Sequence, residues 1–255
     1  MTRRRCEIPA VEKIPAWSSK GVHDSTLACV LQYVAPGAKV LELGAGAGAL
    51  SQKLYDAGYK ITAGDYNENS FVPQHIVCKH MDCDNAKLMV DLFGSEEYDA
   101  VVCGDLIEHL KTPWAFVESI SRLLKRHGIV FITTPNVTSP SSRINLLVNG
   151  NPNSFGKKAI EIGHISPIFP ATMINMLESS GFSLLKVMGV SRVSIFRQYS
   201  VKGMAQALLT VLFRPLMRNV LAKHEIIMFV ARKSSTISEI STPPGVGSEG
   251  FFALK

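Results

Sequence analysis

The sequence predicts an α/β fold with a doubly wound, Rossmann-like and mostly parallel sheet. Two observations lead to this prediction: short apolar runs alternate with segments of helical periodicity, and a glycine-rich turn follows the first of these runs. The expected strands cover 39–43, 59–63, 75–78, 98–103, 129–133, 182–190 and 224–231, and the expected helices cover 24–34, 51–57, 85–93, 112–124 and 172–180.

The first expected helix precedes the first strand and should cover it. Apolar residues recur at helical spacing from Leu27 to Val34, and Pro36–Gly37 can end the helix. Asp24 or Ser25 is placed to cap its first turn.

The segment Lys39–Leu50, with the sequence KVLELGAGAGAL, predicts a strand, a tight turn and the start of a helix. Gly44, Gly46 and Gly48 allow positive φ angles and let a flat ligand approach the backbone where a helix exposes free N–H groups. Glu42 lies in the buried strand, where a carboxylate needs a partner, and we expect that partner to be a ligand.

The strand after the glycine turn ends in Gly64–Asp65. Asp65 follows the turn by about 20 residues, the distance at which a carboxylate accepts hydrogen bonds from ribose hydroxyls in this architecture. The glycine spacing also fits a dinucleotide fingerprint, so this motif alone does not separate the two kinds of cofactor.

Two further acids follow later strands. Asp82 comes after the third strand, where a capping role for Asp82 or Asp84 on the next helix competes with contact to a bound adenine. Asp105 follows the buried fourth strand in the sequence GDLIEHL, before Thr112–Pro113 begins a helix as N-cap and first residue. Because the carboxyl ends of parallel strands meet at one edge, the four acids predict one site. They are Glu42, Asp65, Asp82 and Asp105.

The second half of the domain carries two segments of unusual composition. Residues 135–170 are rich in Asn, Ser, Pro and Gly, and we interpret them as an acceptor-side loop. Residues 203–222 are strongly apolar, but Arg214–Pro215 interrupts them before they reach the roughly 20 residues that a membrane-spanning helix needs. We favour a packed helical insertion here over a helix lying in a membrane interface.

Composition indicates one globular domain in a reducing compartment. The 255 residues are 46% hydrophobic and 19% charged, with a net charge of +6 that favours acidic surroundings. Five cysteines without a Cys-x-x-Cys motif are typical of an intracellular protein, so we expect cytoplasmic location, with peripheral contact to the inner face of a membrane as an option. We expect an N-terminal extension (1–20), a cofactor-binding domain (21–233) and a disordered tail (234–255).

With these motifs in place, the chain resembles class I S-adenosylmethionine-dependent methyltransferases, especially the ubiquinone-biosynthesis O-methyltransferase branch. The resemblance covers about Val22 to Gly189 and rests on VLELGAGAG, the strand ending in Asp65, CGDLIEHLKTP, LLKRHGIVFITTPN and GHISPIFPATMINMLESSGF. It implies a seven-stranded sheet whose last strand is antiparallel, with S-adenosyl-L-methionine as cofactor.

The resemblance also implies a role for each site residue. Glu42, Gly44, Gly46 and Gly48 would surround the methionine half of the cofactor. Asp65 would bind the ribose, Asp82 with Cys83 would face the adenine, and Asp105 would lie near the reactive methyl group and the acceptor.

Two histidines are candidate catalytic bases: His109, directly after Glu108, and His164 in GHISP. In some relatives the positions of Asp105, Glu108 and His109 hold a divalent metal, but the relatives often have Glu where this chain has Asp105, and we assign no metal ligand from the sequence.

Three functions remain open at this point. The first is O-methylation of a small molecule or of a lipid-linked or glycan acceptor. The second is an RNA-terminal 2′-O-methyltransferase, which Asp105, Glu108, His109 and the later His164 suggest. That family usually carries paired histidines and a more basic or aromatic surface than this chain shows. The third is a cofactor-binding protein without catalysis, which the intact glycine turn and the four acids disfavour.

Overall fold

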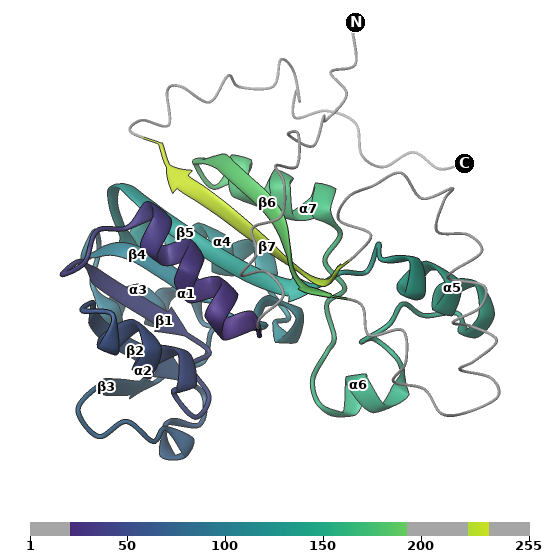
Figure 1. Cartoon of the computed structure of the whole chain (residues 1–255), viewed down its shortest axis with the longest axis horizontal. Coiled ribbons are helices and arrows are strands. Elements are labelled where there is room, and N and C mark those ends of the chain that lie inside the picture. Colours follow the sequence, from purple (N-terminus) through teal and green to yellow (C-terminus); the bar gives the residue numbers. More distant parts are fainter. Residues whose placement is uncertain (1–20, 193–223, 235–255) are drawn as a thin grey trace, which may run out of the picture.

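A computed structural model describes residues 21–192 and 224–234, and its centre is a seven-stranded sheet with the order β3-β2-β1-β4-β5-β7-β6 (Figure 1). Neighbouring strands pair in parallel from β3 to β5, whereas β7 pairs antiparallel with both β5 and β6. The predicted doubly wound fold with an antiparallel last strand is confirmed. The strands are β1 (Lys39–Leu43), β2 (Lys60–Asp65), β3 (Val77–His80), β4 (Tyr98–Cys103), β5 (Leu124–Pro135), β6 (Phe182–Arg192) and β7 (His224–Lys233).

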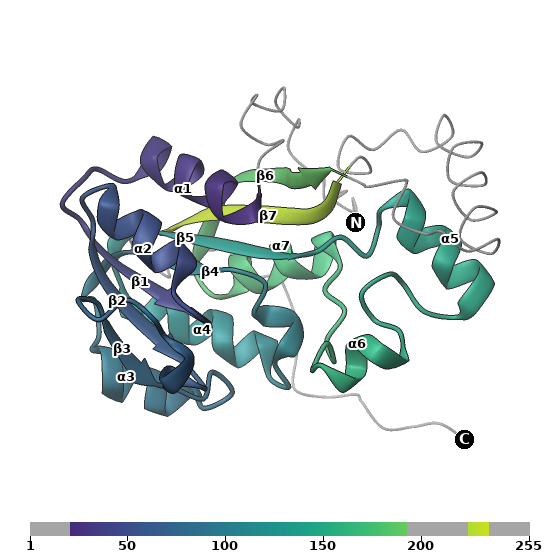
Figure 2. The ribbon, with the colours of Figure 1, turned by 60° about the horizontal axis from the view of Figure 1, so that its bottom comes forward.

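Helices cover both faces of the sheet (Figure 2). On one face, α1 (Val22–Tyr33) and α2 (Ala49–Asp56) bury Val30 and Leu54 against Phe131 of β5. On the other face, α3 (Ala86–Phe93), α4 (Pro113–Leu123) and α7 (Pro170–Ser179) form the larger core cluster. These two buried layers hold the carboxyl ends of β1 and β4 side by side, where the strand order reverses and α/β sheets bind their ligands.

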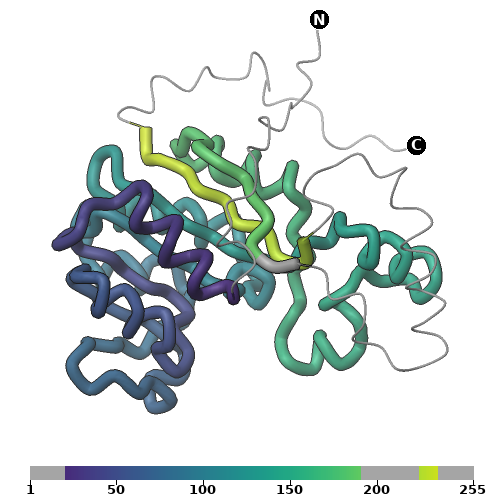
Figure 3. Tube along the Cα trace, viewed as in Figure 1, coloured from purple at the N-terminus to yellow at the C-terminus, as the bar shows by residue number. Residues whose placement is uncertain are grey.

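The segment between β5 and α7 differs from the prediction. Residues 135–170 contain two helices, α5 (Pro140–Asn149) and α6 (Lys157–Glu161), that project beyond the ends of the strands (Figures 1 and 3). Ser139 caps α5 by accepting the N–H of Ser142, and Pro140 occupies the first helical position. This capping signal is present in the sequence, but the polar composition of the segment obscured it.

Two predicted caps are also wrong. Helix α1 begins two residues before Asp24, with Gly21 as N-cap, so neither Asp24 nor Ser25 caps it, and Asp24 instead pairs with Lys53 of α2. Asn85, not Asp82 or Asp84, caps α3 by accepting the N–H of Leu88.

None of the described helices is long and apolar enough to span a bilayer. The predicted insertion at 203–222, the N-terminal extension and the tail lie outside the described residues.

Candidate active site

The glycine turn between β1 and α2 lies open at the carboxyl edge of the sheet. Gly44, Gly46 and Gly48 all have positive φ angles, of 73°, 54° and 84°. A Cβ on Gly48 would lie 2.6 Å from Pro73, whereas one on Gly46 would meet no atom within 4 Å. Gly48 is therefore required for packing and backbone conformation, while the space over Gly46 is free for a ligand.

Asp65 lies directly beside this turn. Its carboxylate accepts the N–H of Gly46 at 2.7 Å and the N–H of Asn67 at 2.8 Å. The carbonyl of Gly64 accepts the N–H of Gly44 at 2.8 Å, so the end of β2 and the glycine turn form one unit. This geometry places the carboxylate where the ribose of a bound cofactor is expected.

Glu42 is buried at the end of β1 and has a partner within the protein. Its carboxylate accepts a short hydrogen bond from the Ser51 hydroxyl of α2, a partner that sequence reasoning did not find. Burial raises the pKa of Glu42 to about 7, an effect that the Ser51 hydrogen bond only partly offsets. One carboxyl oxygen is thus held by the fold, and the group is poised between its neutral and charged forms at neutral pH.

The loop after β3 divides its two acids between two roles. Asp82 is exposed at the sheet edge, and its carboxylate accepts the N–H of Asp84 at 3.0 Å. Asp84 accepts the backbone N–H groups of Lys111 and Thr112, both at 2.8 Å. Asp84 therefore joins this loop to the turn before α4, a link that the sequence analysis missed because the two segments are distant in the chain.

Cys83, between these acids, is buried. Burial raises the pKa of its thiol to about 12, so it stays protonated and can contribute only packing beside an adenine ring.

Asp105 follows β4 in a strained conformation. Its φ angle is 47°, in the left-handed region that non-glycine residues rarely occupy. Its N–H donates to the Thr133 hydroxyl at 3.0 Å, and that hydroxyl donates to the carboxylate at 2.8 Å. Burial raises the pKa of Asp105, while Thr133 and the nearby His23, His164 and His109 oppose the rise. The carboxylate thus lies near both candidate bases.

Glu108, His109 and His164 form one cluster near Asp105. Each offers a ligand atom, and these atoms all lie within 4.8 Å of one another. The two imidazole rings have centroids 4.6 Å apart and meet edge to face at 84°. The structure therefore brings together the two histidines that the sequence singled out, and adds Glu108 to them.

Glu108 is fully buried, with one carboxyl oxygen held and the other free. Oε2 accepts from the Thr134 hydroxyl at 3.1 Å, whereas Oε1 has no hydrogen-bond partner among the described residues. Burial, reinforced by the charge of Asp105, raises the pKa of Glu108 to about 8. An unsatisfied buried oxygen beside two imidazoles is typical of a site that takes up a cation or a polar ligand.

Each histidine of the cluster has one ring nitrogen occupied by the backbone. Nδ1 of His164 lies 2.9 Å from the carbonyl oxygen of Ser154, and His109 donates to the backbone of Gly163. Because a carbonyl can only accept, Nδ1 of His164 carries a proton, which leaves Nε2 as the acceptor of the neutral ring. Burial lowers the pKa of His109, and the nearby His164 lowers it further, which favours its neutral form. Backbone carbonyls that fix ring orientation in this way are the usual support of metal-binding histidines.

Hydrogen bonds hold the His164 loop against the 3₁₀ turn η3 (Ile107–His109). The carbonyl oxygen of Glu108 accepts the N–H groups of Ile165 and Ser166, both at 2.9 Å. The Ser166 hydroxyl donates to the carbonyl of Leu110 at 2.6 Å. These contacts, which no local pattern predicts, explain how His164 reaches His109.

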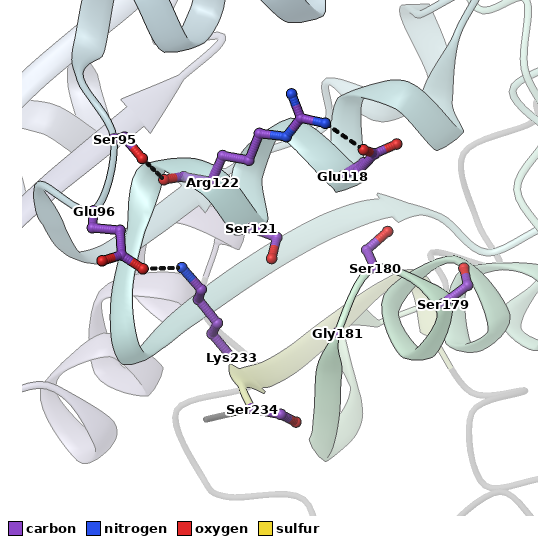
Figure 4. A pocket seen from close by; sticks show the side chains of 10 residues that line it. All are labelled: Ser95, Glu96, Glu118, Ser121, Arg122, Ser179, Ser180, Gly181, Lys233 and Ser234. Carbon is purple, nitrogen blue, oxygen red and sulfur yellow. Dashed lines mark hydrogen bonds and ion pairs between the residues drawn. The ribbon is translucent and has the colours of Figure 1, made fainter. Parts of the chain in front are cut away.

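A groove lies elsewhere in the described part of the chain, near the start of β6 and the ends of α4 and α7 (Figure 4). It has a volume of about 490 Å³, and its charged groups are paired within the protein, Lys233 with Glu96 and Arg122 with Glu118. It contains none of the predicted site residues. The start of β6 and the end of the antiparallel β7 lie at the sheet edge opposite the glycine turn, so this groove is not the cofactor site.

The sheet order, the glycine turn and the acids at the strand ends together define the class I S-adenosylmethionine-dependent methyltransferase fold. The chain belongs to the methyltransferase domain family, whose model, described as "Methyltransferase domain", matches residues 23–187. This family implies S-adenosyl-L-methionine as the cofactor.

Curated relatives include ubiquinone biosynthesis O-methyltransferases. The chain is 30% identical to the one from Glaesserella parasuis over 112 residues, which are 40% of this chain and 48% of that protein. It is 24% identical to the one from Nitrosomonas europaea over 172 residues, 64% of this chain and 72% of that protein. The first match thus spans about half the length of the relative.

Among solved structures, an S-adenosylmethionine-dependent methyltransferase from Archaeoglobus fulgidus is similar, with a TM-score of 0.59 and 19% identity. The match covers 84% of this chain and 95% of that one. At this identity the likeness shows the shared fold alone.

Proposed function

We propose that the chain transfers the methyl group of S-adenosylmethionine to a hydroxyl oxygen of a small or lipid-linked acceptor. The observation that supports this proposal is the cluster of Glu108, His109 and His164 beside Asp105, on the acceptor side of the glycine turn. It offers two imidazoles, of which burial favours the neutral form of His109, and a carboxyl oxygen without a partner among the described residues, where an acceptor would have to lose a proton.

The protein's task in this reaction is chiefly positioning. S-adenosylmethionine supplies a methyl group on a positively charged sulfur, which is already a strong electrophile. The glycine turn with Asp65 would fix that cofactor, and the acceptor oxygen would be held in line with the carbon–sulfur bond. As the new carbon–oxygen bond forms and the carbon–sulfur bond breaks, His109 would take the hydroxyl proton, with His164 as the second candidate.

The same cluster fits a divalent cation. Glu108, His109 and His164 would hold it, because the buried Oε1 of Glu108 has no partner among residues 21–192 and 224–234 and both rings are oriented by backbone carbonyls. A cation held there would act as a Lewis acid and lower the pKa of the acceptor hydroxyl. His109 would then serve as a ligand, and the acceptor oxygen would attack as an anion.

A peripheral contact with a membrane fits the projection formed by α5 and α6. Leu147 on α5 and Ile162 after α6 are 86% and 70% exposed, and Lys157 and Lys158 lie exposed on α6. Exposed apolar side chains next to lysines favour an anionic lipid surface. The projection adjoins the histidine cluster, because Ser154, between α5 and α6, accepts a hydrogen bond from His164. A lipid-linked acceptor bound at the projection would therefore be presented close to His109 and His164.

The acceptor class is tested by incubating the protein with methyl-labelled cofactor and separated fractions of a cell lysate, membrane extract and small RNA. The proposal predicts label in an organic-extractable or small-molecule product. Label confined to RNA that is lost on removal of its terminal nucleotides would identify the RNA-terminal alternative instead.

A further inference from the structure

Two consecutive threonines end β5, and each donates a hydrogen bond to a different acid of the site. Thr133 donates to Asp105 at 2.8 Å, and Thr134 donates to Glu108 at 3.1 Å. Both threonines are only 1% exposed. Each of these buried hydroxyls donates to one carboxylate. Strand propensity alone does not explain why threonine occupies both positions, because valine would suit β5 equally well.

The two threonine side chains lie on opposite faces of the sheet. Successive side chains point to opposite faces, so Thr133 shares the face of Phe131 with α1 and α2, and Thr134 shares the face of Ile132 with α4 and α7. Asp105 accordingly lies near His23 of α1. The two acids are therefore held from opposite sides of the sheet, by independent contacts.

The Thr134 hydrogen bond determines which atom of Glu108 is available. It occupies Oε2, while Ile165 and Ser166 occupy the backbone carbonyl of the same residue. Of the Glu108 oxygens, only Oε1 remains without a partner in the described part of the chain. One carboxylate oxygen of Glu108 and one ring nitrogen each of His109 and His164 lie within 4.8 Å of one another.

We infer that Thr134 is a positioning residue that presents Glu108 to a divalent cation, whereas Thr133 positions Asp105 for the cofactor. This inference rests on the cation site of the proposed function. The hydroxyl groups of Thr133 and Thr134 can be removed separately by mutation, so the two roles can be tested independently.

The test compares Thr134→Val and Thr133→Val, which replace each hydroxyl by a methyl group of similar size. Mn²⁺ binding is measured by titration calorimetry on the cofactor-free protein, and S-adenosylhomocysteine binding is measured on the metal-free protein. Thr134→Val should weaken Mn²⁺ about 10- to 100-fold and leave S-adenosylhomocysteine binding unchanged. Thr133→Val should weaken S-adenosylhomocysteine about tenfold and leave Mn²⁺ binding unchanged.

Two controls separate positioning from general loss of structure. Thr134→Ser keeps the hydroxyl and should restore Mn²⁺ affinity, even if Thr134→Val folds poorly. Thr62→Val removes a hydroxyl that bonds to Tyr98, away from the site, and should change neither affinity.

The outcomes are distinct. If wild-type protein binds no Mn²⁺, the cation site of the proposed function fails and the role of Thr134 fails with it, while methyl transfer through His109 as a base would still stand. If wild type binds Mn²⁺ but Thr134→Val binds it equally well, or both valine variants weaken it to the same extent, only the division of roles between the threonines is overturned.

Discussion

The imidazole of His164 lies edge to face against that of His109, with ring centroids 4.6 Å apart, although the whole segment from α4 through β5, α5 and α6 separates them in the sequence. Glu108 contributes a free carboxyl oxygen to the same cluster.

Removal of either histidine distinguishes base catalysis from cation binding. If His109 is the base, His109→Ala should lower turnover at saturating cofactor about 100-fold or more, with partial recovery at high pH, and a chelator should have little effect on the wild type. If the cluster holds a cation, a chelator should abolish wild-type turnover, added Mg²⁺ or Mn²⁺ should restore it, and His164→Ala should be as defective as His109→Ala.

His75 supplies the matched control for these variants, because it packs against Tyr55 away from the cluster. His75→Ala should retain wild-type turnover. If both cluster variants also did so, neither histidine would take part, and positioning of an already ionised acceptor would be the surviving mechanism.

Asp65→Ala should weaken S-adenosylmethionine binding by about 1.5 to 3 kcal/mol, because a carboxylate that hydrogen-bonds to ribose hydroxyls is lost. The same change frees the N–H of Gly46, which Asp65 accepts in the structure. Isothermal calorimetry measures the effect, with the exposed Asp91→Ala as the control that should bind normally. Wild-type affinity in Asp65→Ala would show that Asp65 does not bind the ribose. Tighter binding of NAD than of S-adenosylmethionine would show that S-adenosylmethionine is not the cofactor.

Because Glu42 is buried, the free energy of unfolding should depend on pH. Burial raises its pKa to about 7 from an ordinary value of 4.5, so the native state holds the proton more tightly than the unfolded chain. Its contribution to stability is therefore full below about pH 4.5 and is lost as the pH rises through 7. Between pH 5 and pH 8 the wild type should lose about 3 kcal/mol more than Glu42→Gln, which stays neutral.

Urea unfolding of both proteins at several pH values measures this difference, and the other titrating groups cancel in the comparison. Parallel pH profiles for the wild type and Glu42→Gln would show that Glu42 has the same pKa in the native state as in the unfolded chain, against the burial argument.

Exposed apolar side chains on the α5–α6 projection should bind anionic vesicles. Flotation with phosphatidylglycerol vesicles at low salt should recover the wild type, and Leu147→Ser combined with Ile162→Ser should reduce the bound fraction. Val77→Ser removes a similarly exposed side chain from β3, at the far end of the sheet order, and should have no effect. Equal flotation of all three proteins, or of none, would remove the projection as a membrane contact.

Local sequence patterns predicted most of the sheet. The apolar run at 98–103 coincides with β4, because a strand buried on both faces has a composition that little else shares. The run ending at Asp65 coincides closely with β2. The glycine turn was equally readable, since positive φ angles at Gly44, Gly46 and Gly48 leave few alternatives to glycine.

The acceptor side could not be predicted in the same way. Helices α5 and α6 lie in a polar segment, where the capping signal of Ser139 and Pro140 is weaker than the general tendency of such composition to form loops. The approach of His164 to His109 depends on backbone N–H groups of Ile165 and Ser166, whose partners are set by tertiary packing. Likewise, Thr134 acquires its role only because β4 and β5 pair in a register that brings it to Glu108.

The most direct test of the account is transfer of a labelled methyl group from S-adenosylmethionine to an acceptor in membrane extract, measured for the wild type, for His109→Ala and for Asp91→Ala. The account predicts a labelled product with the wild type and with Asp91→Ala, and a loss of about 100-fold or more with His109→Ala at saturating cofactor. If the wild type bound S-adenosylmethionine but transferred label to nothing in the extract, the lysate fractions or the RNA, the chain would be a cofactor-binding protein without catalysis, contrary to the central claim.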